Sequence, residues 1–181
     1  MDFALHWDEQ LINQALALQV RQSDFVISTY PAAFSFAGED AVHEPIASNT
    51  VVLAVEPKAR FEPGSSTLTF KGYVKASNEP VEGYHLAAGC LFGPGHIVDA
   101  FPYDPHFYFL GEEQSYALRL FTHGWTIFHT SFLPIYHLYN TTPEIQAMRP
   151  LHWDRQFEKL RSQPWKKFDK HSNTRLTKLL Q

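Results

Sequence analysis

The chain has 181 residues, of which 44 % are hydrophobic and 15 % aromatic, and its formal net charge is −4 at pH 7. This composition predicts one globular domain over residues 1–181 and excludes an intrinsically disordered chain. The mild charge does not favour a nucleic-acid partner, and no apolar run reaches the ~20 residues of a membrane span. A single cysteine excludes an internal disulfide framework. With no secretory signal visible, we expect a cytoplasmic protein.

The first half of the chain alternates helix and strand patterns. An apolar stripe from Leu11 to Leu18 predicts a helix near residues 8–21, and Phe25 to Tyr30 is a buried-strand pattern that Pro31 stops. Residues 31–47 have the composition of a loop. Strands are predicted at 50–55 and 66–74, followed by a polar turn over 75–83. A helix followed by a strand is the repeating unit of an α/β sheet, so this half predicts the α/β class.

The second half continues this pattern up to residue 139. We predict a strand at 87–92, a helix opened by Glu112 and Glu113 and ended by Gly124, and strands at 125–129 and 135–139. A basic helical tail follows from about residue 150 to residue 181. Between Arg155 and Gln181 it carries eight Lys or Arg and two acids. A solvated helical face is preferred over a membrane or nucleic-acid surface, because acids elsewhere balance this charge.

Glycines, paired carboxylates and histidines gather most densely between Tyr84 and Tyr139. Glu112 and Glu113 fit ordinary helix-start chemistry, because the helix dipole stabilises carboxylates there. The alternative, which the two glutamates alone favour less, is a site in which Gly111 turns the backbone and points both carboxylates into a cleft at a strand end. His137 lies in a short apolar run, where a structural histidine is more usual than a metal ligand.

The order of several motifs resembles the polypeptide N-acetylglucosaminyltransferase family of the hydroxyproline type. The motifs are Ala-Gly-x-x-Phe-Gly (88–93), Pro-Tyr-Asp-Pro (102–105), Phe-x-Gly-Glu-Glu (109–113), Arg-x-x-Thr-His-Gly (119–124) and His-Leu-Tyr (137–139). The resemblance is dense over about residues 84–139 and looser on both sides. It implies a metal-dependent, retaining glycosyltransferase of the GT-A fold that uses a UDP-sugar donor.

The resemblance also implies roles for particular residues. Glu112 and Glu113 match the acidic pair beside the reacting sugar, and His137 matches the histidine that completes a manganese site. Further substrate-binding positions are implied in the glycine-rich turn, the pocket wall and the backbone turn before the acidic pair, namely Gly89, Cys90, Asp104 and Gly111. A divalent cation such as Mn²⁺ would suit the departure of a diphosphate.

The chain departs from the family at its beginning. The family's acidic metal-binding motif lies upstream of the first helix, and no Asp-x-Asp or Asp-x-His stands at the matching place here. Gly38-Glu39-Asp40 is a poor substitute because it falls in a predicted polar loop. We therefore expect an α/β, mixed-sheet, GT-A-like fold that lacks most of the nucleotide-binding half. Its exposed sheet edge would favour a homo-oligomer.

Two functional hypotheses follow, and a third is weak. The leading one is transfer of N-acetylglucosamine to a hydroxyl of a protein or small-molecule acceptor. We expect the chain to be incomplete, as the product of a truncated gene model, of deliberate shortening, or of a split or decayed enzyme. The alternative is a non-catalytic module that binds a glycan or peptide. A metal hydrolase is disfavoured because no second ligand stands at His-x-x-x-His spacing.

Overall fold

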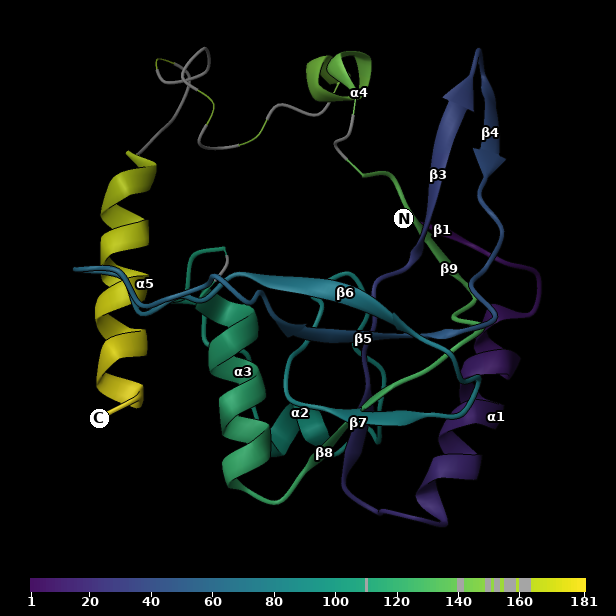
Figure 1. The fold of residues 1–181 in the computed structure, drawn as a ribbon, viewed down its shortest axis with the longest axis horizontal. Coiled ribbons are helices and arrows are strands. Elements are labelled where there is room, and N and C mark those ends of the chain that lie inside the picture. The colour runs from purple at the N-terminus through teal and green to yellow at the C-terminus, as the bar shows by residue number, and fades with distance from the viewer. Residues whose placement is uncertain (110, 140–141, 149–150, 152–153, 155–158, 160–163) are drawn as a thin grey trace.

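The computed structural model describes residues 1–109, 111–139, 142–148, 151, 154, 159 and 164–181. In these residues the chain forms an α/β fold with three small sheets and five helices (Figure 1). The elements are, in chain order, β1 (Asp2–Phe3), α1 (Trp7–Gln19), β2 (Phe25–Ile27), β3 (Ala32–Ala37), β4 (Asp40–His43), β5 (Thr50–Val55), β6 (Phe70–Lys75), β7 (Val81–Gly83), α2 (Ile97–Ala100), α3 (Gly111–Thr122), β8 (Thr126–His129), β9 (Ile135–His137), α4 (Pro143–Met148) and α5 (Trp165–Leu179).

A three-stranded sheet in the order β2-β8-β7 lies between α1 and α3. β2 runs parallel to β8, and β7 runs antiparallel to it. Side chains alternate between the faces of a strand, so Phe25 and Ile27 pack with Leu18 of α1. Val26 points the other way and packs with Leu120 of α3. These side chains are at most 1 % exposed, and burial of each contributes roughly 1.5–3 kcal/mol. The mixed-sheet α/β expectation is confirmed at this level.

Residues 32–43 form a hairpin and not the loop that the sequence predicted. β3 pairs antiparallel with β4, and Ala37 lies opposite Asp40 at the closed end. Gly38 has φ 68°, a left-handed conformation that glycine adopts without strain. Figure 1 shows this hairpin extending away from the rest of the sheet structure. At its base β3 also pairs with β9, which pairs with β1 on its other side.

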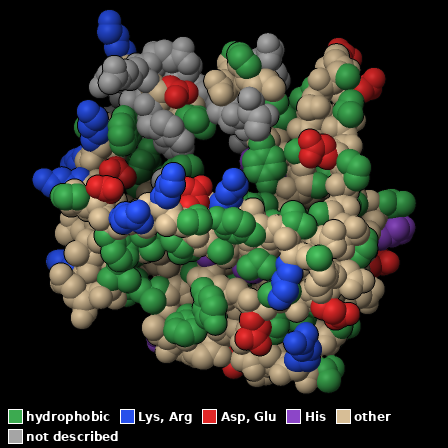
Figure 2. Space-filling view, in the orientation of Figure 1, with side chains coloured by type: hydrophobic (Ala, Val, Ile, Leu, Met, Phe, Trp, Pro, Cys, Tyr) green, Lys and Arg blue, Asp and Glu red, His purple; other side chains and the backbone are tan. Residues whose placement is uncertain are grey.

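β5 and β6 form a separate antiparallel ribbon. Figure 2 shows hydrophobic and basic side chains close together across the middle of this face, where Figure 1 places the ribbon. Tyr73 and Val74 are 39 % and 71 % exposed there. The predicted strand at 66–74 starts later, at Phe70, because the backbone N–H of Leu68 donates to the Gln114 side chain of α3.

Two more expectations about strands were wrong. The predicted polar turn at 75–83 ends in β7, which β8 recruits by antiparallel pairing. The predicted strand at 87–92 is instead a tight turn, Ala87–Cys90, followed by an isolated bridge between Phe92 and Ile27. Strands at 25–30 and 135–139 were correctly placed but end earlier, at Ile27 and His137.

The predicted helices are confirmed. α1 and α3 lie within two residues of the expected bounds, and Gly124, just beyond α3, has φ 80° as a helix-ending glycine should. α5 supplies the predicted helical tail and packs beside α3 (Figure 1). Most of residues 149–163 lies outside the described residues. None of the helices in the described parts of the chain is long and apolar enough to span a bilayer.

Candidate functional site

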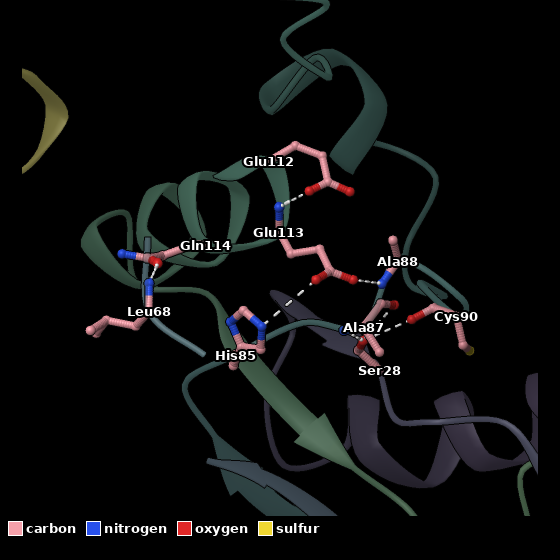
Figure 3. Close-up of polar contacts among 9 residues, drawn as sticks. All are labelled: Ser28, Leu68, His85, Ala87, Ala88, Cys90, Glu112, Glu113 and Gln114. Atoms are coloured by element: carbon pink, nitrogen blue, oxygen red, sulfur yellow. Dashed lines mark hydrogen bonds and ion pairs between the residues drawn. The ribbon is translucent and has the colours of Figure 1, made fainter. Parts of the chain in front are cut away.

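The candidate site lies where the first turn of α3 faces the segment 85–90, next to the end of β2 (Figure 3). Parallel strands end here on one side of the sheet, and such strand ends commonly form ligand-binding crevices in α/β proteins. Three contacts join these segments, which lie far apart in the sequence. They come from Ser28, Glu113 and His85.

Ser28 fixes the Ala87–Cys90 turn to the end of β2. The turn closes with a 3.0 Å hydrogen bond from the Cys90 N–H to the Ala87 carbonyl. The Ser28 hydroxyl accepts from the Ala87 N–H at 2.8 Å and donates to the Cys90 carbonyl at 2.7 Å. Ser28 is fully buried, so these bonds replace solvent for both backbone groups.

The two residues of the glycine-rich turn point in different directions. The Cys90 side chain lies in an apolar cluster with Leu11, Leu133 and Ile135, and burial raises the pKa of its thiol to about 12. A Cβ at Gly89 would lie 3.4 Å from Pro31 and 4.0 Å from the His137 ring. The structure thus places Gly89, but not the Cys90 thiol, beside the other candidate residues.

Glu113 reaches from α3 to this turn. Its Oε1 accepts a 2.5 Å hydrogen bond from the Ala88 N–H, and its Oε2 lies 3.9 Å from Nε2 of His85. The side chain is 22 % exposed, and burial raises its pKa. Glu113 therefore links α3 to the turn, and its two carboxylate oxygens point toward Ala88 and His85 (Figure 3).

His85 is the buried neighbour of Glu113. Its ring stacks on Phe70 with 3.3 Å between the ring centroids. Burial and the nearby His129 ring lower the pKa of His85 to about 3, so the imidazole is neutral at pH 7. The contact with Glu113 is for that reason not a pair of opposite charges. His85 thus presents a polar ring nitrogen to Glu113, while its ring face packs on the apolar Phe70.

Glu112 lies on the more open side of the helix start. It accepts a hydrogen bond from the Glu113 N–H, as a carboxylate in a first helical turn often does, and it is hydrogen-bonded to Tyr103. Burial and the negative charge of Glu113 raise the pKa of Glu112 to about 7. A carboxyl with this pKa exchanges a proton readily near neutral pH.

Asp104 and Gly111 lie on the α5 side of α3. Asp104 pairs with Arg175 and accepts from the His106 N–H at 3.0 Å. Burial opposes ionisation of Asp104, but these two donors hold its pKa below the usual value. The expected sharp backbone turn falls at Phe109, with φ 45°. Gly111 is instead a packing position, since a Cβ there would lie 2.8 Å from the Ser172 hydroxyl.

His137 lies at the end of β9 against Tyr139, with 4.4 Å between the ring centroids. Among the described residues, no group of three or more His, Cys, Asp or Glu side chains converges on a common point. His137 therefore offers one ligand only, and these residues do not fit a complete Mn²⁺ site.

Sequence reasoning missed Ser28 and His85. The signal for Ser28 was a polar residue directly after the buried run Phe25–Ile27, at a strand end. His85 carried no such signal, because its place beside Glu113 depends on the β6 and α3 contacts that only the fold creates.

Comparison with protein-family models gives a match over the whole chain. The family model described as "Glycosyltransferase (GlcNAc)" matches residues 1–181. Comparison with curated proteins found no match, and comparison with solved structures found none either. Since the family match extends over the whole chain, the chain belongs to the GlcNAc glycosyltransferase family.

Proposed function

We propose that the chain takes part in transfer of N-acetylglucosamine from a nucleotide-sugar to a hydroxyl group, with Glu112 as the residue that exchanges the proton. The observation that carries this proposal is the carboxyl pair at the start of α3, in which Glu113 is engaged with the turn and Glu112 has a pKa of about 7. Family membership supplies the reaction class.

In the proposed reaction, the ionised Glu112 accepts the proton of the acceptor hydroxyl. The acceptor oxygen bonds to the anomeric carbon of the sugar as the bond from that carbon to the diphosphate breaks. The diphosphate leaves with the electron pair of the broken bond. Glu113 is a positioning residue, since its contact with Ala88 fixes the turn opposite Glu112. A positioned general base of this kind contributes roughly 10²–10⁴ in rate.

The finer assignments come from the sequence resemblance and are part of the proposal. They are a UDP-sugar donor, a hydroxyproline-type acceptor, a GT-A fold and a divalent cation to which His137 contributes. The ligands that would join His137 are not gathered around it in the described part of the chain.

This last observation favours a second candidate, a non-catalytic module that binds a glycan or peptide. The module would use the surface where the first turn of α3 meets the Ala87–Cys90 turn, without turnover. The two candidates differ in a measurable way, because only the enzyme requires an ionisable group at position 112.

The test combines calorimetry with a turnover assay. UDP-N-acetylglucosamine is titrated into the chain with and without Mn²⁺, and release of UDP is followed with a hydroxyproline peptide. We expect Glu112→Gln to lower turnover about 10²-fold or more with little change in donor affinity. Glu82→Gln, an exposed glutamate on β7, is the matched control.

Three outcomes separate the candidates. Turnover that Glu112→Gln leaves intact refutes the proton-transfer role. Binding of a glycan or peptide without turnover in the unsubstituted chain establishes the module. Absence of both donor binding and turnover refutes the proposed transfer by this chain.

A further inference from the structure

A pocket of about 640 Å³ lies next to the candidate site, between the segment 102–107, α3 and the last turns of α5. Its walls include Tyr103, Asp104, Arg119, Arg175 and Lys178. Figure 1 shows α3 and α5 side by side, which is the arrangement that brings Arg119 and the two α5 cations together.

The pocket is positively charged. Among the described residues that line it, Arg119, Arg175 and Lys178 oppose one carboxylate, that of Asp104. The carboxylate pairs with Arg175, whereas the described ion pairs of the structure include neither Arg119 nor Lys178. Within the part of the chain that the structure describes, two of the three cations thus have no ion pair with a carboxylate.

Arg175 also has an unused donor. Its Nε is buried and has no hydrogen-bond partner among the described residues. A buried N–H without an acceptor costs free energy, so the hydrogen-bonding capacity of Arg175 is not fully used by the described residues. The guanidinium group of arginine matches the paired oxygens of a carboxylate or phosphate particularly well.

The pocket adjoins the proposed reacting group. Tyr103 lines the pocket and is hydrogen-bonded to Glu112. On α3, Ser115 and Arg119 follow Glu112 by three and seven positions, and both line the pocket. Residues at this spacing share one face of a helix, so Glu112 and the pocket lie along a continuous strip of α3.

We propose that this pocket binds an oxyanion, a carboxylate or phosphate, held by Arg119, Arg175 and Lys178. The oxyanion belongs to a molecule whose hydroxyl or sugar lies at Glu112, and this placement rests on the proposed function. The binding itself does not rest on that function. The source is either the phosphate of a nucleotide or an acidic group of the acceptor.

Substitution of Asp104 tests the proposal through the direction in which ligand affinity changes. Its carboxylate occupies Arg175 and repels an incoming anion, so Asp104→Asn should tighten binding, whereas Lys178→Gln should weaken it. A purely structural role for these charges would not change ligand affinity in opposite directions. Lys178 is exposed on α5, so its substitution leaves the core intact.

The experiment is calorimetric titration of the chain at low salt with inorganic diphosphate in one arm and glutarate in the other. Lys178→Gln should weaken binding about two- to fivefold and Asp104→Asn should strengthen it by a similar factor. Lys75→Gln, an exposed lysine on β6, is the control and should change nothing. Binding should also weaken as salt is added.

The two arms identify the source of the oxyanion. Preference for diphosphate indicates a nucleotide, and preference for glutarate an acidic acceptor. If neither probe binds saturably, or if Lys178→Gln and Lys75→Gln behave alike, the pocket is not an oxyanion site. Because binding is measured without turnover, the affinity for diphosphate or glutarate can be interpreted even if the proposed sugar transfer fails.

Discussion

Removal of the Ser28 hydroxyl should destabilise the protein more than removal of an ordinary buried hydroxyl. Ser28→Ala deletes the acceptor of the Ala87 N–H and the donor to the Cys90 carbonyl, at 2.8 Å and 2.7 Å. Ala87 and Cys90 are 1 % and 5 % exposed, so water does not readily replace the lost partner. Each buried group left unsatisfied costs about 1–3 kcal/mol, and we expect a total loss of about 2–5 kcal/mol.

Ser131→Ala is the matched control. Ser131 is 7 % exposed and makes a single 2.7 Å hydrogen bond to the carbonyl of Asn78. Asn78 is exposed, so solvent can reach its carbonyl after the substitution. The expected loss is about 1 kcal/mol, the usual net value of one hydrogen bond.

Urea unfolding followed by tryptophan fluorescence measures both variants, and amide exchange at Ala88 reports on the turn itself. The amide proton of Ala88 should exchange faster in Ser28→Ala, because the turn has lost its hydrogen bonds to the Ser28 hydroxyl. The contact with Glu113 remains in this variant. If Ser28→Ala loses no more stability than Ser131→Ala, the hydroxyl does not hold the turn and our account of the site's construction is wrong.

Three further predictions concern packing, protonation and thiol access. Gly83→Ala should cost about 1–3 kcal/mol in urea unfolding, since its Cβ would lie 2.0 Å from the buried His129 ring; Gly95→Ala, with open space around it, should cost far less, and equal losses would contradict this. The pKa of Glu112 is raised from 4.5 to about 7 in the folded chain. The stabilisation that comes from its protonation in the folded state is therefore fully present below pH 4.5 and is lost as the pH rises through 7. Relative to the unsubstituted chain, Glu112→Gln should therefore gain about 1–3 kcal/mol between pH 4.5 and pH 8, and a pH-independent difference would refute the shift. The pKa of buried Cys90 is raised to about 12, so a thiol reagent at pH 8 should modify it only at the rate of unfolding, and rapid labelling of the native chain would show that the thiol is accessible.

The buried layers of the fold were predictable from the sequence because their signals are local. The apolar run Phe25–Ile27 and the helical stripes of α1 and α3 each show their burial within a few residues. The hairpin at 32–43 also carried a signal, with Phe34 and Phe36 alternating before Gly38. The polar pair Glu39-Asp40 masked it, since Glu39 lies in the exposed turn and Asp40 begins a strand that is exposed along its whole length.

The candidate site was predictable only in part. The position of Glu112 and Glu113 at a helix start follows from local rules, and the structure confirms it. Their partners do not follow, because Ser28 lies 59 residues from Ala87 and Ala88 lies 25 residues from Glu113. Gly111 shows a related limit. Its need to be small comes from Ser172 on α5, which sequence reasoning near residue 111 could not detect.

The parallel pairing of β2 with β8 has a consequence for how the molecule folds. Ser28 and His129, which meet at the end of this pair, are 101 residues apart. Closing so long a loop costs chain entropy before any contact is gained, and such pairings form slowly. The Ala87–Cys90 turn is anchored to the same strand end, so its lasting order depends on that closure. During synthesis, the anchored turn and the contacts around it therefore form only after β8 has left the ribosome.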